Sequence, residues 1–219
     1  MTFNTMIRLP ALPLLLAAAF AAPVGAADGQ SRGETANDAP STASAIFGGG
    51  CFWCVEQAYD KVEGVVATTS GFSGGQLEDP SYDEVSSGDT EHIEVVKVDY
   101  DPEVVDYRTL LYVFWRNIDP FAVNRQFCDQ GRPYQSALFP KNAEQRAQAE
   151  TTRDAMAERF DREIGIEILD DTPFYAAETY HQDYYQKNSV RYNFYKSACG
   201  RKDRLEEVWG DEASAHTMP

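Results

Sequence analysis

The sequence has 219 residues and a formal net charge of −16, with 19 Lys and Arg against 35 Asp and Glu. Such an acidic chain lacks the basic surface that nucleic-acid binding needs, so we exclude nucleic acid as a partner. Its length suits a short leader followed by one domain with a real hydrophobic core.

The first 27 residues have the three parts of a secretory signal peptide. Arg8 precedes an apolar stretch over residues 12–22, and small residues follow it. This stretch is well below the roughly 20 residues that a membrane-spanning helix needs. We therefore predict cleavage after Ala26 or Ala27 and an exported, periplasmic protein. Residues 28–44, rich in Gly, Ser, Thr, Asn, Asp and Ala, are predicted to form a flexible linker.

The chemistry is most concentrated at residues 48–56, which read Gly-Gly-Gly-Cys-Phe-Trp-Cys-Val-Glu. A strand-like run at residues 45–47 precedes them and a helical pattern over residues 52–62 follows, so the glycines permit a sharp turn from strand to helix. A cysteine in the first turn of a helix faces unpaired amide N–H groups, which favour its thiolate. Cys51 is therefore the predicted nucleophile.

The rest of the chain alternates strand and helix patterns up to about residue 210. No strand is apolar throughout, as the strands of a parallel sheet would be. The pattern predicts one α+β domain over residues 45–210, with a mixed β-sheet flanked by helices, and a flexible tail at residues 211–219. Strands are predicted at 65–75, 92–100, 136–139 and 165–169, helices at 107–117, 142–160 and 178–188, a loop or short helix at 80–85, and irregular structure at 121–131.

Residues 50–56 resemble the signature of the A-type peptide methionine sulfoxide reductases. The family's later blocks are similar, in the same order, to residues 71–75, 82–88 with 92–94, 129–139 and 181–184. The resemblance implies thiol-dependent reduction of methionine S-sulfoxide, free and peptide-bound, to methionine. No glycine pattern of a nucleotide-binding site is present, so we expect no bound cofactor and a thioredoxin-like protein as electron donor.

The resemblance also implies the residues of the site, in which Cys51 attacks the sulfur of methionine sulfoxide. A carboxylic acid kept protonated by burial can donate a proton to the sulfoxide oxygen, so Glu94 is predicted to have a raised pKa. The other implied positions are Tyr82 and Tyr134 with Glu94 around the oxygen, Phe52, Trp53 and Tyr184 around the S-methyl group, and Asp129 at a further position of the site.

Attack leaves a sulfenic acid on Cys51, which condenses with a second thiol to an intramolecular disulfide. Cys199 is the first candidate, because it lies in a flexible-looking tail and resolving cysteines of the family often lie in such a tail. Cys54 is the second, because a separation of three positions on a rigid helix is awkward for a disulfide. Cys128, next to Asp129, is the third candidate thiol or a residue that lines the pocket, and it is expected to be structural.

Two other functions stay open on the residues alone. Cys51 and Cys54 form a Cys-x-x-Cys pair, which also occurs in thioredoxin-type thiol–disulfide oxidoreductases. An exported binding module with structural cysteines is the third interpretation, although it leaves the glycines beside Cys51 unexplained. The three histidines, including His181, are scattered and the cysteines lack a second close pair, so no metal site is predicted.

Overall fold

The structure is a computed structural model that describes residues 42–219. The predicted signal peptide and residues 28–41 of the predicted linker lie outside the described residues. The strands are β1 (Ala43–Gly48), β2 (Val65–Ser73), β3 (Ile93–Tyr100), β4 (Arg125–Gln126), β5 (Asp129–Gln130), β6 (Ala137–Phe139), β7 (Glu167–Ile168) and β8 (Tyr175–Ala176). The helices are α1 (Phe52–Tyr59), α2 (Tyr82–Ser86), α3 (Tyr107–Arg116), α4 (Ala143–Phe160), α5 (Tyr184–Lys187), α6 (Ser189–Ala198) and α7 (Arg201–Trp209).

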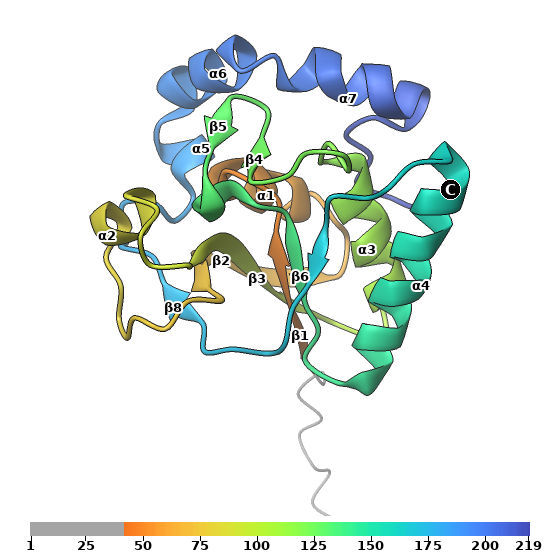
Figure 1. The fold of residues 1–219 in the computed structure, drawn as a ribbon, viewed down its shortest axis with the longest axis horizontal. Coiled ribbons are helices and arrows are strands. Elements are labelled where there is room, and N and C mark those ends of the chain that lie inside the picture. The colour runs from red at the N-terminus through yellow and green to blue at the C-terminus, as the bar shows by residue number, and fades with distance from the viewer. Residues whose placement is uncertain (1–41) are drawn as a thin grey trace, which may run out of the picture. The chain divides into compact units, whose positions relative to one another are not determined.

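Six strands form one sheet in the order β7-β6-β1-β3-β2-β8 (Figure 1). β6 and β7 are parallel, and the other neighbouring strands are antiparallel. The predicted α+β fold with a mixed sheet is therefore confirmed. The segment predicted to be irregular contains the short β4–β5 hairpin, which is a separate two-stranded sheet.

Strand β3 divides the core between the two faces of the sheet, because successive side chains of a strand point to opposite faces. Val96 and Val98 pack in the large cluster that includes residues of α1 and α3. Ile93 and Val95 pack in a smaller cluster on the other face. Glu94 shares the parity of Val96 and Val98, so the sheet directs its side chain to the α1 face. Figure 1 shows α3 and α4 side by side next to the sheet.

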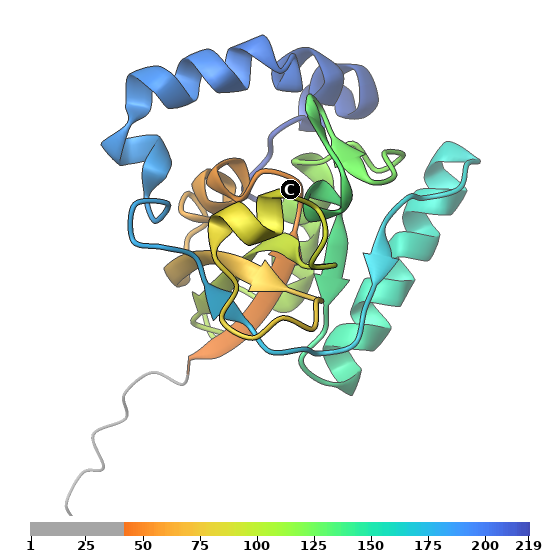
Figure 2. The same cartoon turned by 60° about the vertical axis from the view of Figure 1, so that its left-hand side comes forward.

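The C-terminal part differs most from the prediction. The expected helix over residues 178–188 is present only as α5, because Asp183 adopts a left-handed conformation with φ of 53° at its start. The tail expected to be flexible around Cys199 forms α6 and α7, which run above α1 and the β4–β5 hairpin in both ribbon views (Figures 1 and 2). Burial of Tyr192, Leu205 and Trp209 anchors these two helices.

Both predicted boundaries of the domain move outwards. β1 begins at Ala43, which pairs with Tyr100, so the last two residues of the predicted linker belong to the sheet. In the predicted C-terminal tail, Glu212 accepts hydrogen bonds from Arg116 and Arg159. The ordered domain thus extends past residue 210.

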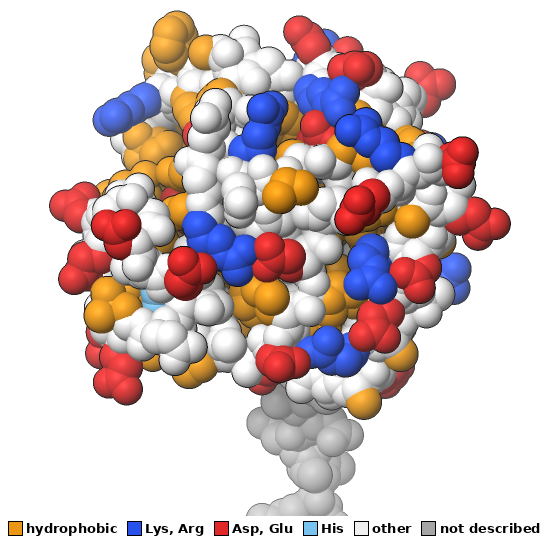
Figure 3. Space-filling model, in the orientation of Figure 1, with side chains coloured by type: hydrophobic (Ala, Val, Ile, Leu, Met, Phe, Trp, Pro, Cys, Tyr) orange, Lys and Arg blue, Asp and Glu red, His pale blue; other side chains and the backbone are white. Residues whose placement is uncertain are grey.

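Charge is distributed without a basic field on the face drawn in Figure 3, where Lys and Arg side chains alternate with Asp and Glu. This distribution agrees with the acidic composition of the whole chain. Among residues 42–219, no helix combines the length and apolar character needed to cross a membrane.

Candidate active site

The turn from β1 to α1 holds Cys51 at the start of the helix. Gly50 has φ of +79°, and a Cβ there would lie 2.4 Å from Cβ of Gln126. Only glycine accommodates both the conformation and the close approach. Cys51 itself is the N-cap residue of α1, with φ of −48° and ψ of 116°, and is 6% exposed. The glycine run therefore places the cysteine inside the protein, ahead of the helix rather than within it.

Glu94 approaches the same turn from β3. Its Oε2 accepts a hydrogen bond of 2.9 Å from the backbone N–H of Phe52, and its side chain is 2% exposed overall. Burial raises the pKa of Glu94 to about 8, against the opposing effect of the Phe52 hydrogen bond. The carboxyl is thus protonated at neutral pH, as the sequence analysis predicts, and can donate a proton beside Cys51.

A cavity of about 60 Å³ opens between these two residues. One water occupies about 30 Å³ of liquid, so the cavity suits a group as small as a methyl sulfoxide. The structure brings together seven of the residues implied by the resemblance and adds an eighth, Tyr195. The lining consists of Cys51, Phe52, Trp53, Tyr82, Glu94, Asp129, Tyr134 and Tyr195.

Tyr82 and Tyr134 supply hydroxyl groups to the cavity. The first is placed by α2, whose N-cap Ser81 makes a reciprocal capping box with Glu84. Burial raises the pKa of Tyr82 to about 12, and a hydrogen bond from Tyr134 acts in the opposite direction. Burial also raises the pKa of Tyr134. Both phenols therefore keep their protons at neutral pH and are available as donors.

Aromatic rings form the wall around Trp53. Tyr184 does not line the cavity but stacks on the Trp53 ring at 3.8 Å, with an angle of 8° between the planes. Nδ1 of His181 accepts a hydrogen bond of 3.1 Å from Nε1 of Trp53, and burial lowers the pKa of His181. The histidine is neutral and positions Trp53.

Cys51 and Cys54 are free thiols that form a hydrogen-bonded pair. The hydrogen bond from Cys51 lowers the pKa of Cys54 to about 6, although burial acts to raise it. Arg201, Tyr192 and Lys196 lower this pKa further. Burial raises the pKa of Cys51. The negative charge of the resting pair therefore lies on Cys54. The sequence predicted a thiolate on Cys51 instead, because that prediction used only the position of Cys51 at the helix start and not its burial.

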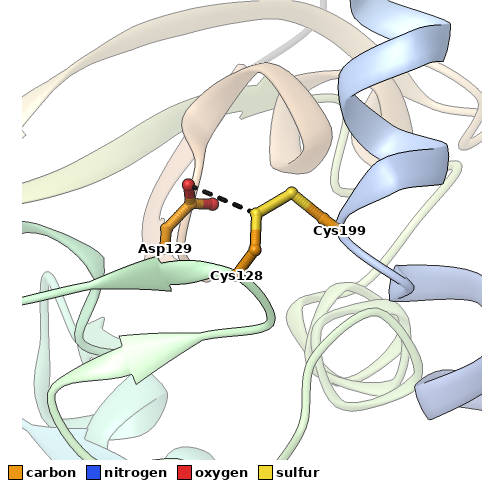
Figure 4. A group of neighbouring side chains, drawn as sticks. All are labelled: Cys128, Asp129 and Cys199. Carbon is orange, nitrogen blue, oxygen red and sulfur yellow. Dashed lines mark hydrogen bonds between the residues drawn. A yellow bond between two sulfur atoms is a disulfide. The ribbon is translucent and has the colours of Figure 1, made fainter.

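The other two cysteines form a disulfide between the β4–β5 hairpin and the end of α6 (Figure 4). Sγ of Cys128 lies 3.7 Å from Oδ1 of Asp129, which lines the cavity. Cys199 is thus bonded to Cys128 and not free to react with Cys51 in this state. Within residues 42–219, these two sulfurs and Asp129 are the group with the spacing of metal ligands. Because the sulfurs are bonded to each other, they offer a metal no thiolate.

Tyr195 is the site residue that the sequence analysis missed. Its hydroxyl donates a short hydrogen bond to Oδ2 of Asp129, and its ring meets the Trp53 ring edge-on at 5.9 Å. Cys199 lies four positions further along the same helical face. This spacing of four positions from Cys199 is the only feature of the sequence that could have indicated Tyr195 as a site residue. It does so only if the tail is helical.

Glu56 closes the signature motif and holds the turn that precedes Tyr184. The side chain is 1% exposed and accepts a hydrogen bond of 3.1 Å from the backbone N–H of Asp183. Burial raises the pKa of Glu56 to about 7, and the charges of Asp60 and Asp183 act in the same direction.

This raised pKa predicts how stability depends on pH. The folded protein retains a proton on Glu56 that the unfolded chain has lost, so this contribution to stability is complete below about pH 4.5 and is lost as pH rises through about 7. We expect Glu56→Gln to gain stability relative to the wild type across that interval. Urea unfolding at several pH values measures it, with the exposed Glu158→Gln as control. A difference that does not vary with pH would contradict the assignment.

Comparison with known proteins agrees with this geometry. The sequence profile of the family described as peptide methionine sulfoxide reductase matches residues 43–213. Peptide methionine sulfoxide reductase MsrA 2 of Caulobacter vibrioides is 44% identical over 78% of this chain and 88% of that protein. Peptide methionine sulfoxide reductase MsrA/MsrB of Vibrio cholerae is 43% identical over 78% of this chain, and the match spans 46% of that longer relative.

The fold comparison gives the same result. The structure of Mxr1 from Saccharomyces cerevisiae in its reduced form superimposes with a TM-score of 0.65 and 30% identity. The match covers 69% of this chain and 88% of that one. With the profile covering most of the chain and the relatives well above 30% identity, the chain belongs to the peptide methionine sulfoxide reductase family.

Proposed function

We propose that this protein reduces methionine S-sulfoxide to methionine by transferring the sulfoxide oxygen to the sulfur of Cys51. One observation carries the proposal: a buried cysteine and a protonated carboxyl, Glu94, line the same small aromatic cavity. Phe52 and Trp53 offer apolar surface to the S-methyl group. Family membership supports the same reaction.

Protons move as oxygen is transferred. The Cys54 thiolate is hydrogen-bonded to the Cys51 thiol and can take its proton, which creates the nucleophile at the moment of attack. Cys51 then attacks the electrophilic sulfur while Glu94 donates a proton to the sulfoxide oxygen. The S–O bond of the substrate breaks, methionine leaves, and Cys51 becomes a sulfenic acid. Glu94 then regains its proton from Cys54, which is thereby a thiolate again for the second step.

We assign the second step to Cys54 in place of Cys199. The objection to Cys54 assumed that both cysteines lie in a rigid helix, but Cys51 is the N-cap residue with non-helical ψ, so the two thiols reach each other. The Cys54 thiolate attacks the sulfenic sulfur, the Cys51–Cys54 disulfide forms, and hydroxide leaves as water. Cys199 is already bonded to Cys128.

Cys54→Ser should separate the two steps. The variant keeps the nucleophile and the acid but loses the thiolate that takes the Cys51 proton, so we expect a slower burst of about one methionine per protein molecule. Turnover with a thioredoxin system should fall by roughly tenfold or more, because a sulfenic acid replaces the disulfide that exchange requires. Quenched-flow measurement of methionine, with dimedone trapping of the sulfenic acid, tests this. Wild-type turnover in Cys54→Ser would exclude Cys54 as the resolving thiol.

The alternative function, thiol–disulfide exchange between proteins through Cys51 and Cys54, is not favoured. Exchange alone needs only two neighbouring thiols, and it gives no role to the aromatic rings that line the cavity beside Cys51. Exchange also gives no role to a protonated Glu94. Reduction of insulin at a rate independent of methionine sulfoxide would revive this alternative.

Electrons for the next turnover are proposed to come from a thioredoxin-like dithiol, which would reduce the Cys51–Cys54 disulfide by exchange. The leader at residues 1–27 supports export to the periplasm as the place of action. The mass of the protein purified from a periplasmic fraction tests export. The result expected is loss of the first 26 or 27 residues, and a full-length cytoplasmic product would contradict it.

A further inference from the structure

Tyr195 closes the cavity from a part of the chain remote from the signature motif. It lies on α6, and its hydroxyl is bonded to a side chain of the site. The O–H donates to Oδ2 of Asp129, and Tyr195 and Cys51 line the same cavity. The ring edge packs on Trp53. No other residue of α6 or α7 lines this cavity.

Two sets of contacts hold α6 in this place. On one side, the hydroxyl of Tyr192 and the ammonium of Lys196 both donate to Oε1 of Gln57 on α1, at 2.7 and 2.6 Å. On the other side, Cys199 at the end of α6 is bonded to Cys128, with a Cα–Cα distance of 4.9 Å. Tyr195 is on the same helix as these anchors, and Figure 4 shows that the disulfide lies next to Asp129, the partner of the Tyr195 hydroxyl.

We propose that Tyr195 is a further catalytic residue of the Cys51 site, which stabilises the Cys51 thiolate through its hydroxyl, and that the Cys128–Cys199 disulfide holds it in position. The proposal deepens the function proposed above, because it assigns a role in that same reaction to α6 and to the second pair of cysteines.

The chemistry of the hydroxyl fits this role. A phenol has one proton, which in the resting site goes to Asp129. When Cys51 loses its proton, the O–H can turn to the sulfur, and a hydrogen bond to a charged acceptor is stronger than one to a neutral acceptor. Burial raises the pKa of Cys51, and the Tyr195 hydrogen bond opposes that rise. Burial raises the pKa of Tyr195, so its hydroxyl keeps the proton it must offer.

Tyr195→Phe removes the hydroxyl and keeps the ring. We expect kcat/KM for methionine sulfoxide to fall roughly 10- to 100-fold, the range for losing a hydrogen bond to a charged group. We also expect the pH midpoint for alkylation of Cys51 by iodoacetamide, followed on its peptide by mass spectrometry, to move upward. Tyr185→Phe is the matched control: its hydroxyl bonds to Asp60, away from Cys51, and both readouts should stay at wild-type values.

The disulfide is tested with the double variant Cys128→Ser with Cys199→Ser. If the disulfide acts by holding Tyr195, the double variant lowers kcat/KM. Tyr195→Phe then lowers kcat/KM by a smaller factor in the double variant than in the wild type. If the two changes lower kcat/KM independently, so that their factors multiply, the link between the disulfide and Tyr195 would be overturned. An unchanged alkylation profile in Tyr195→Phe would overturn its contact with the thiolate. Alkylation needs no substrate, so its result stands apart from whether the wild type produces methionine.

Discussion

Replacement of Cys51 by serine is expected to abolish the formation of methionine from methionine sulfoxide. The serine hydroxyl stays protonated at neutral pH, and oxygen cannot accept a further oxygen as sulfur does on forming a sulfenic acid. Loss of an attacking nucleophile costs on the order of 10⁴-fold or more in rate. Methionine release, measured chromatographically with dithiothreitol as reductant, should fall to the level without enzyme.

The fold should survive this change, because serine is close in size to cysteine and Cys51 makes no side-chain cap to α1. A circular dichroism melting curve that matches the wild type would show this. Sustained turnover by Cys51→Ser would mean that a different thiol attacks the substrate and would remove the assignment of the nucleophile.

Glu94→Gln is expected to lower kcat/KM by roughly 10²- to 10⁴-fold, the range typical of losing a general acid. Glutamine has nearly the same shape, and its side-chain oxygen can still accept the hydrogen bond from the Phe52 N–H. It cannot transfer a proton to the sulfoxide oxygen. The loss therefore reports proton donation rather than packing.

The pH profile gives a second signature of the same residue. Burial raises the pKa of Glu94 to about 8, so the acid form is present below that pH and is lost above it. The rate of the wild type should fall as pH rises through about 8, and this alkaline limb should disappear in Glu94→Gln. A variant that loses less than tenfold in rate and keeps the limb would contradict the acid role of Glu94.

Local sequence patterns predicted the elements that carry the site. The glycine run before Cys51 indicated a turn between a strand and a helix, and Gly50 indeed takes a conformation and a position that only glycine allows. Alternation along residues 92–100 predicted β3. Composition over residues 142–160 predicted α4, and the Asn142 side chain at its start accepts a hydrogen bond from the N–H of Gln145.

The pairing of the cysteines could not be predicted in the same way, because spacing along the chain carries no information about contacts between distant segments. Cys128 and Cys199 are 71 positions apart, and their bond depends on α6 crossing the β4–β5 hairpin. Tyr195 escaped notice for the same reason. Its residue type is unremarkable on a tail, and it becomes a site residue only when that tail folds as a helix over α1.

The burial of Glu94 and of the two thiols also could not be predicted from the sequence. Glu94, taken as one polar residue of a strand, would normally face solvent, and only the family resemblance suggested otherwise. The strand parity explains the result, because Glu94 lies on the face that α1 covers. The charge of the thiol pair also follows from burial together with the hydrogen bond between the two sulfurs.

Mapping the disulfide that forms in a single turnover tests the proposed reaction most directly. Reduced wild-type protein, freed of reductant, is mixed with one equivalent of methionine sulfoxide, alkylated in acid-quenched samples over time and digested for mass spectrometry. We expect one methionine per protein and a Cys51–Cys54 disulfide that appears first. A first disulfide between Cys51 and Cys199, or methionine formed while Cys51 stays alkylatable, would contradict it.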